Sequence, residues 1–254
     1  PRPDFTPLLL PQLTPPAASR AHWAATFPAS SAPGALARLL DHDNHAARAR
    51  LRALLNSSAV FQPPMETARS VNPPDIPAQR ELALERLKTI TDAGLISVED
   101  FRTNPLNIFA VHELAGLADG AMATKMTVQF NLFGGTVLKL GTSRHHSPTS
   151  PTSPSFLSRI DSLSAIGCFA LTELGFGNNA PEMRTEARTL RDPASGAVTF
   201  RIRTTAPQAA KYWITNGAVH ARYAVVFARL IDLGGEDQGV HAFLVEVRGR
   251  GRGR

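Results

Sequence analysis

A glycine-rich stretch, Gly175-Phe176-Gly177-Asn178-Asn179-Ala180, has the spacing of a dinucleotide-binding loop and follows an apolar segment. In such loops the glycines let backbone N–H groups approach a phosphate, and a helix that starts directly after them helps to bind it. Here Pro181 interrupts the expected helix, and a strand-like segment follows. The pattern therefore favours a plain turn, with a Gly/Asn loop that approaches a phosphate as the alternative.

Two imidazoles, His42 and His45, lie three residues apart in the segment Asp41-His42-Asp43-Asn44-His45. On a helix this spacing would place both rings on one face, where they could bind a metal ion. No third metal-ligating side chain follows at a spacing typical of a metal site. A solvated polar helix face is the favoured interpretation, and we expect no metal site.

The remaining nucleophiles lack catalytic partners. The single cysteine, Cys168, lies in an apolar strand-like segment, where a buried and inert thiol is expected. One cysteine also excludes a disulfide scaffold and a multi-cysteine zinc or iron–sulfur site. Ser162 and Ser164 have no His and Asp at a telling spacing, and no G-x-S-x-G is present. His145 and His146 are expected to face solvent.

The net charge of +6 over 254 residues invites a nucleic-acid interpretation. The excess is carried by the two ends, because residues 1–70 have a net charge of +3 and residues 248–254 of +4. The body between them is nearly neutral, so neither a basic face nor a nucleic-acid partner is expected. Apolar residues make up 43%, enough for a sizeable core. No run approaches the about 20 apolar residues of a membrane-spanning helix.

Helical periodicity dominates the first part of the chain after a flexible, Pro-rich leader at residues 1–34. Apolar residues recur at helical spacing in residues 35–55, 78–93 and 106–118. Gly94 ends the second of these helices, Ser97 can accept a backbone N–H at the start of a further one, and Pro105 suits the first turn of the third. Residues 124–140 are ambiguous, because their own propensities favour strand and their neighbourhood favours helix.

The pattern changes after a Ser/Pro/Thr-rich, low-complexity insert at residues 147–155. Beyond it lie short segments rich in β-branched and aromatic residues, separated by turn signals such as Asn216-Gly217. The predicted strands cover residues 167–171, 184–190, 198–202, 211–215, 223–231 and 240–247. Because helices come first and strands second, we expect an α+β fold with two segregated domains, the second a small antiparallel β-barrel or sandwich.

Three segments of the second part are specific beyond their composition. In chain order they are GCFALTELGFGNN at residues 167–179, KYWITNGAVHARYAVVFARL at residues 211–230 and GVHAFLVEVR at residues 239–248. Together they resemble the middle domain of the acyl-CoA oxidase and acyl-CoA dehydrogenase flavoenzymes. Residues 126–146, MTVQFNLFGGTVLKLGTSRHH, resemble the oxidase branch in particular. The resemblance implies a helical domain over residues 35–146, with residues 124–140 helical, and a middle β-domain over residues 156–247 before an Arg/Gly tail.

The resemblance implies FAD as cofactor and oxidation of an acyl-CoA to the trans-2-enoyl-CoA, with O2 reduced to H2O2 in the oxidases. Thr172, in the TEL segment, would hydrogen-bond the flavin ring, and Trp213 and Thr215, in WITNG, would lie beside the flavin. Gly177 and Asn178 would lie near the pyrophosphate and substrate, with Asn where Ser is common. The alternative is that Trp213 is only a core residue of the barrel and Thr172 a strand residue facing solvent.

Members of this family continue into a C-terminal helical domain, which carries the catalytic Glu and makes much of the oligomer interface. No acid of this sequence matches that base, and Glu173, beside Thr172, is not its counterpart. We therefore expect the N-terminal part of an acyl-CoA oxidase, inactive as an isolated chain, from a homodimeric parent that acts on acyl-CoA. The resemblance also implies the peroxisome, and Arg38-Leu39, followed after five residues by His45-Ala46, fits a short import pattern that often arises by chance.

Two other classes of function stay open at this point. One is a non-catalytic module that binds flavin or acyl-CoA or pairs with another subunit. More distant are an acyl-CoA dehydrogenase that uses another electron acceptor and a Rossmann oxidoreductase.

Overall fold

A computed structural model describes residues 40–61, 75–148 and 153–249. The described residues from 47 onward belong to one compact unit and residues 40–46 to another. The leader at residues 1–34, Arg38-Leu39 of the import pattern and the end of the Arg/Gly tail lie outside the described residues. No described helix is long and apolar enough to cross a membrane.

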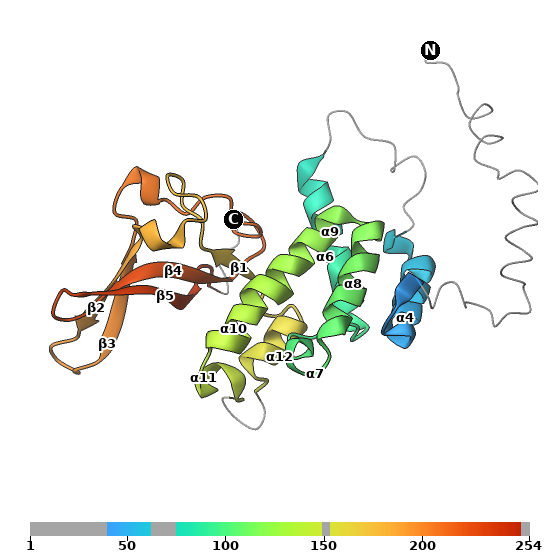
Figure 1. Ribbon diagram of the computed structural model, residues 1–254, viewed down its shortest axis with the longest axis horizontal. Coiled ribbons are helices and arrows are strands. Elements are labelled where there is room, and N and C mark those ends of the chain that lie inside the picture. Colours follow the sequence, from blue (N-terminus) through green and yellow to red (C-terminus); the bar gives the residue numbers. More distant parts are fainter. Residues whose placement is uncertain (1–39, 62–74, 149–152, 250–254) are drawn as a thin grey trace, which may run out of the picture. The chain divides into compact units, whose positions relative to one another are not determined.

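Helices fill the first part of the described chain and strands the second (Figure 1). The α-helices are α4 (His45–Ser57), α6 (Ile76–Asp92), α7 (Asp100–Thr103), α8 (Pro105–Ala118), α9 (Gly120–Met126), α10 (Gly135–Leu140), α11 (Ser143–His146) and α12 (Phe156–Asp161). The strands are β1 (Gly167–Ala170), β2 (Glu186–Arg191), β3 (Val198–Arg203), β4 (Tyr223–Ile231) and β5 (Asp237–Glu246). This mixed helix-and-sheet architecture confirms the expected α+β class.

Local signals set the starts and stops of three helices, and those predicted at Gly94, Ser97 and Pro105 are confirmed. Asp75 caps α6 by accepting a hydrogen bond from the Ala78 N–H at 3.0 Å, and Gly94 follows that helix with a φ of 62°. This φ lies in the left-handed region, which glycine adopts without steric cost. Ser97 Oγ accepts from the Glu99 N–H at 3.1 Å just before α7, and α8 begins at Pro105, as expected.

The helix predicted over residues 35–55 is wrong in its middle. His42 and Asn44 have φ values of 64° and 44°, which end the helix, and α4 starts afresh at His45. Asp and Asn compete for local backbone hydrogen bonds, so an Asp/Asn-rich stretch favours such a break. His42 and His45 therefore do not lie on one helix face. Among the described residues, no cluster of three His, Cys, Asp or Glu side chains could hold a metal ion.

The ambiguous residues 124–140 are helical, as the resemblance implies. α9 continues through a π-helical segment, η2 (Thr127–Gly134), into α10, and the three run end to end in Figure 1. Gly134 lies at a close approach, because a Cβ there would meet Val98 Cγ2 at 2.6 Å. Beyond α10, His145 and His146 are half-buried rather than solvent-facing, and His146 Nε2 lies 2.9 Å from the carbonyl of Val137.

The sheet has five strands and mixed pairing, which corrects the expectation of an antiparallel barrel or sandwich. β4 is central: β1 and β2 pair with it in parallel along successive stretches, and β5 pairs with it antiparallel. β3 extends the sheet from β2, antiparallel. Residues 211–215, predicted as a strand, form a bridge at Lys211 and then a series of turns. A run of β-branched and aromatic residues does not specify the direction of its partner strand, which explains the unexpected parallel pairing.

One hydrophobic cluster joins the helices to the sheet. It contains Phe130 and Phe133 of η2 together with Tyr223 and Val225 of β4. Gly167, the first residue of β1, lies against the Phe133 ring, where a Cβ would come within 2.2 Å of the ring carbons. The two expected domains therefore share their main core, and only a small second cluster around Cys168 belongs to the β part alone.

A buried amide strengthens the same junction. Gln129 is fully buried; its Nε2 donates to the carbonyls of Ile160 and Ala165, both at 3.0 Å, and its Oε1 accepts from the Gly167 N–H at 2.9 Å. Because an unpaired buried amide is costly, this set of three hydrogen bonds fixes where β1 starts relative to η2.

Candidate cofactor site

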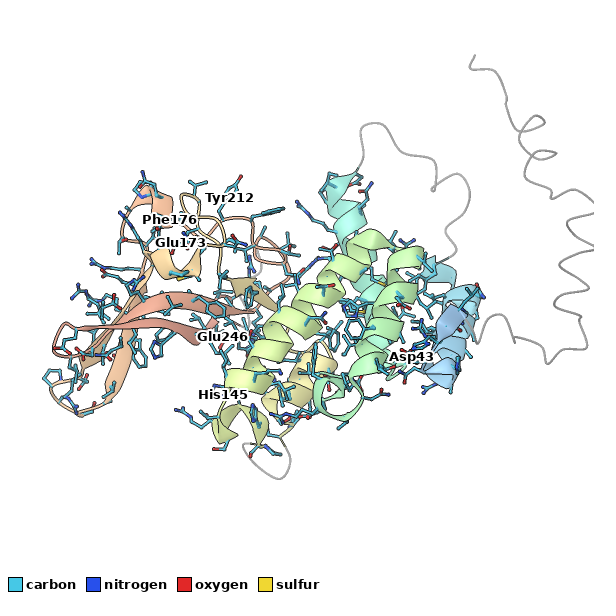
Figure 2. The ribbon with its side chains drawn as sticks, in the orientation of Figure 1. Asp43, His145, Glu173, Phe176, Tyr212 and Glu246 are labelled. Carbon is cyan, nitrogen blue, oxygen red and sulfur yellow. The ribbon has the colours of Figure 1, made fainter. Side chains whose placement is uncertain are left out.

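The five candidate cofactor residues lie on two adjoining loops, residues 171–179 after β1 and residues 211–220 before β4. The Tyr212 N–H donates to the Thr172 carbonyl at 3.2 Å, and Asn216 Nδ2 to the Gly167 carbonyl at 3.4 Å. These contacts join the second loop to both ends of β1, so it runs along that strand. Figure 2 labels Glu173 and Phe176 of the first loop and Tyr212 of the second.

A buried ion pair holds the two loops together. The Glu173 side chain is 1% exposed, and its carboxylate accepts from the backbone N–H groups of Arg184 and Thr185 at 2.9 and 2.8 Å and from the Thr185 hydroxyl at 2.5 Å. Lys211 Nζ lies 3.3 Å from Glu173 Oε1 and donates to the Leu171 carbonyl at 2.8 Å. Each charge therefore has several partners of opposite polarity, which a buried pair requires.

This environment also determines the charge state of the pair. Burial acts to raise the pKa of Glu173, but the hydrogen bonds from Thr185 and Arg184 and the Lys211 charge outweigh it and lower that pKa. Burial lowers the pKa of Lys211, and Glu173 opposes that change. Glu173 is thus a saturated carboxylate that holds the loops, which leaves it a poor proton acceptor.

The Thr172 hydroxyl is half-buried and donates to the carbonyl of Tyr212 at 2.5 Å. A hydroxyl has one donor and two acceptor lone pairs, so Thr172 in this arrangement can still accept a hydrogen bond from a ligand. It follows the end of β1 and is neither buried in the sheet nor fully in solvent.

Trp213 is the most exposed large apolar side chain of the site. It is 87% exposed, its φ is 61°, and its neighbour Tyr212 is 61% exposed. The interpretation of Trp213 as a core residue of the barrel is therefore wrong. A bulky residue with positive φ is unusual and marks backbone that the surrounding structure constrains.

Gly177 and Asn178 form an exposed turn. The Gly177 N–H donates to the Glu173 carbonyl at 2.8 Å, the Gly177 φ is 57°, and no atom lies within 4 Å of where its Cβ would be. A short 3-10 helix, η3 (Ala180–Glu182), follows, and then β2. This confirms a turn rather than a dinucleotide fingerprint, because no long helix starts after the glycines. The open side of Gly177 lets a ligand approach the backbone closely.

Thr215 is half-buried and lines a cavity of about 390 Å³ formed by α6, α9 and residues 214–220. The other four candidates do not line it. Lys125 of α9 reaches this cavity, and its Nζ donates to Asn216 Oδ1 at 3.0 Å. Sequence reasoning missed Lys125; its one available signal was a lone cation within the largely apolar stretch AMATKMTVQF.

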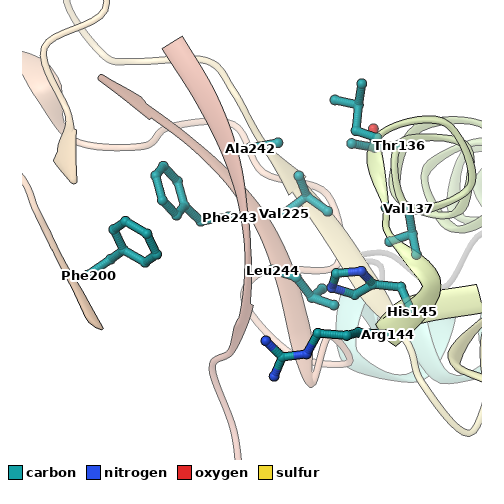
Figure 3. A pocket seen from close by; sticks show the side chains of 11 residues that line it. Thr136, Val137, Arg144, His145, Phe200, Val225, Ala242, Phe243 and Leu244 are labelled. Atoms are coloured by element: carbon teal, nitrogen blue, oxygen red, sulfur yellow. The ribbon is translucent and has the colours of Figure 1, made fainter. Parts of the chain in front are cut away.

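A second cavity, of about 500 Å³, lies between α10–α11 and the sheet (Figure 3). Phe200 and Phe243 form its aromatic wall, with ring centroids 5.2 Å apart, and Arg144 and His145 line the helical side. None of the five candidate residues lines this cavity.

These residues fit a flavin nucleotide in type. Trp213 provides an exposed indole wall, Thr172 a hydroxyl that can accept, and Gly177 an open backbone. Isoalloxazine rings need an apolar face and polar partners at the ring edge, and pyrophosphates need close backbone approach. The structure brings the five residues onto adjoining loops but does not gather them around one cavity.

Comparisons with known proteins agree with the resemblance. The chain is 36% identical over 199 residues to the peroxisomal acyl-coenzyme A oxidase 2 of Arabidopsis thaliana, a match that covers 76% of this chain and 26% of that protein. It is 36% identical over 169 residues to the human peroxisomal acyl-coenzyme A oxidase 3, covering 66% of this chain and 22% of that protein. No family model matches the chain.

Solved structures show the same fold. The crystal structure of acyl-CoA oxidase 3 from Yarrowia lipolytica matches with a TM-score of 0.57 and 25% identity, over 81% of this chain and 27% of that one. Acyl-CoA oxidase 1 of the same yeast matches with a TM-score of 0.59 and 22% identity, over 84% and 28%. The chain thus spans less than a third of the length of these relatives. With two peroxisomal relatives at 36% identity and a shared helix-and-sheet fold, the chain belongs to the acyl-CoA oxidase family and corresponds to part of the length of its members.

Proposed function

We propose that the chain is the N-terminal part of an FAD-dependent acyl-CoA oxidase of fatty acid β-oxidation. The parent protein would convert an acyl-CoA to the trans-2-enoyl-CoA and pass the electrons to O2, giving H2O2. One observation carries the proposal: Trp213, 87% exposed and at positive φ, directly follows Tyr212, which is hydrogen-bonded to Thr172, on loops that resemble the family's flavin segments. A chain that exposes its indole in this way leaves a large apolar contact available to a ligand.

Five residues would hold the cofactor. Trp213 and Thr215 would lie beside the flavin ring, Thr172 would accept a hydrogen bond at its edge, and Gly177 and Asn178 would lie near the pyrophosphate. When bound, FAD supplies the hydride acceptor that oxidation of the acyl group requires. The chain's own contribution is to bind and orient, and the Glu173–Lys211 pair supports both loops that do so.

We also propose that the isolated 254-residue chain makes no H2O2 from acyl-CoA. Removal of an acyl α-proton needs a base, and Glu173, the carboxylate on the candidate loops, is saturated with donors and has a lowered pKa. A positioned base contributes about 10²–10⁴-fold to such a reaction. Steady H2O2 production on adding acyl-CoA to the FAD-loaded chain would contradict this.

Flavin binding is tested by fluorescence. Trp23→Phe leaves Trp213 as the sole tryptophan, and FAD that stacks on it should quench its emission. Followed through the fluorescence of the flavin itself, which needs no tryptophan, Thr172→Ala and Trp213→Ala should each weaken FAD binding, the former by about tenfold because one hydrogen bond is lost. Ser162→Ala, exposed and outside the loops, is the control and should change nothing. If Trp213→Ala leaves the FAD affinity unchanged, Trp213 has no flavin role.

The same titration separates one alternative. A non-catalytic module that pairs with another subunit would bind neither FAD nor acyl-CoA alone. A flavin- or acyl-CoA-binding module would bind without turnover, as the isolated chain of an oxidase would, so it is distinguished by a parent protein that does not turn over acyl-CoA. A parent dehydrogenase would reduce an artificial electron acceptor and give no H2O2 with O2. Localisation in the peroxisome is part of the proposal and is supported by the names of the relatives. A homodimeric parent is also part of it and is supported by the resemblance alone.

A further inference from the structure

Four polar side chains form a chain of hydrogen bonds from α6 through α9 to the second candidate loop. Lys125 Nζ of α9 donates to Asn216 Oδ1 at 3.0 Å and lies 2.8 Å from His220 Nδ1. On its other side, His220 Nε2 lies 2.8 Å from Glu81 Oε1 of α6. Lys125 is only 9% exposed, so its ammonium depends on these partners.

The two contacts of His220 define its tautomer. An ammonium can only donate and a carboxylate only accept, so His220 must accept at Nδ1 and donate at Nε2. His220 thus links the Glu81 carboxylate to the Lys125 ammonium. Burial lowers the pKa of Lys125, and Glu81 opposes that change. We call Glu81, Lys125, Asn216 and His220 the Lys125 clamp.

Asn216 is where the clamp acts on the loop. Its φ is 66°, and beside the Lys125 contact its Nδ2 donates to the Gly167 carbonyl and its own carbonyl accepts from the Ala221 N–H at 2.9 Å. Asn216 is thus bound to β1, to Ala221 just before β4 and to α9 at once. Thr215 precedes it directly, and Trp213 lies three residues before it.

We infer that Lys125 is a positioning residue, which through Asn216 and His220 holds the Trp213–Thr215 turn in the conformation that binds the cofactor. The inference rests on the proposed flavin role of that turn. Trp213 has little packing of its own, being 87% exposed, so the turn needs fixed points on either side. Lys211 supplies the one before it. After it, the Lys125 clamp holds Asn216 and His220, and Arg248 donates to the Gly217 and Ala218 carbonyls at 2.8 Å.

Hydrogen–deuterium exchange on the full chain tests the clamp without any cofactor. Lys125→Met should raise exchange in residues 211–221 by at least about tenfold and leave β4 protected, because only the loop loses its partners. Lys125→Arg, which keeps a buried donor, should restore most of the protection. Lys139→Met removes an exposed lysine of α10 and is the matched control.

Asn216→Gly answers the same question should Lys125→Met fail to fold. Glycine accepts the positive φ, so this variant removes both amide contacts without straining the backbone. It should raise exchange in residues 211–221 and weaken FAD binding by about tenfold, a loss of one to two hydrogen bonds. Unchanged exchange in residues 211–221, or a uniform rise over the whole chain, would overturn the inference.

The two claims can fail separately. If the wild-type chain binds no FAD, the proposed function of the isolated chain fails, while the exchange result still decides whether Lys125 holds the loop. If FAD binds normally to a variant whose loop exchanges fast, the loop is held by the clamp but its position does not matter for the cofactor, and the positioning role is wrong.

Discussion

The helical core and the candidate loops are held by opposite means. The core side chains Ile90, Met126 and Phe130 are fully buried among apolar neighbours. The loops at residues 171–179 and 211–220 expose their large apolar residues and are held by buried charges, Glu173 with Lys211 and Lys125 with its clamp. Apolar packing tolerates small shifts, whereas a buried charge needs its partners at fixed distances. The position of each loop is therefore fixed by a few buried charge contacts. Removing one of these contacts should free a loop without unfolding the core.

The largest expected effect is in the core. Phe130→Ala should lower the free energy of unfolding by about 3–5 kcal/mol, because it leaves a cavity in the space that the fully buried ring filled. Urea denaturation measures the change, and exchange should rise in helices and sheet together since they share one cluster. Leu174→Ala, at a 55% exposed loop position, is the control and should cost less than about 0.5 kcal/mol. A purely local rise in exchange for Phe130→Ala would contradict a shared core.

A smaller and local effect is expected from Glu173→Gln. The change leaves the Lys211 ammonium partly buried without its counter-charge and weakens three hydrogen bonds, at a cost of roughly 3 kcal/mol. Exchange should rise in residues 171–179 and 209–212, while α6 and α8 stay protected. Glu236→Gln, an exposed carboxylate in the β4–β5 turn, should change neither. Equal loss of protection in the helices would show that the loops and the core unfold as one unit.

The two regions should also respond to pH with opposite sign. Hydrogen bonds and Lys211 keep the pKa of Glu173 lowered against its burial, so its stabilisation is present above the unfolded pKa of about 4.3 and is lost as pH falls through the folded value. Asp161 of α12, bound by Ser97 and the Val98 N–H, has its pKa raised by burial. The folded chain therefore binds the Asp161 proton more tightly than the unfolded chain does. The free energy of unfolding decreases as pH rises from the unfolded pKa of Asp161 through its raised folded pKa.

Urea denaturation between pH 3 and 6 checks these signs, with two variants that remove one group each. Glu173→Gln should reduce the rise of stability with pH, and Asp161→Asn should increase it. The same change of slope in both variants would contradict the assigned directions.

The smallest expected effect is on the reaction rate of the single thiol, Cys168, which reports on the second loop. Cys168 of β1 packs with Ala221, Ala224 and Ile214, and burial raises its pKa to about 11, against a small opposite effect of Arg248. At pH 8 only about one thiol in a thousand would be ionised, so a disulfide reagent should react on the order of 10² times more slowly than with the urea-unfolded chain. Lys125→Met should speed the reaction by freeing the loop that covers Cys168, and Lys139→Met should not. A fast wild-type reaction would contradict a closed loop.

Local features were predictable because their causes are local. The end of α6 at Gly94, the hydroxyl of Ser97 before α7 and the start of α8 at Pro105 follow from backbone preferences of single residues. The composition of β4 gave its extent, residues 223–231, correctly. The resemblance placed five candidate residues on segments that the structure brings onto adjoining loops. Their roles at the cofactor stay predictions.

What failed depended on partners far away in the chain. Residues 211–215 have strand-forming composition, yet Lys211 turns toward Glu173, 38 residues earlier, and the chain then follows the edge of β1. The directions of β1 and β2 relative to β4 are likewise invisible in any one strand.

The sequence by itself determined the helix-then-strand order, the end of α6, the start of α8 and the family, since these depend on neighbouring residues. Only the tertiary structure decided that Trp213 is exposed, that Glu173 is saturated, and that Lys125 reaches Asn216 across 91 residues. The physical reason is that burial and charge pairing depend on which distant surfaces meet, and a stretch of sequence encodes its own preferences but not its neighbour's position.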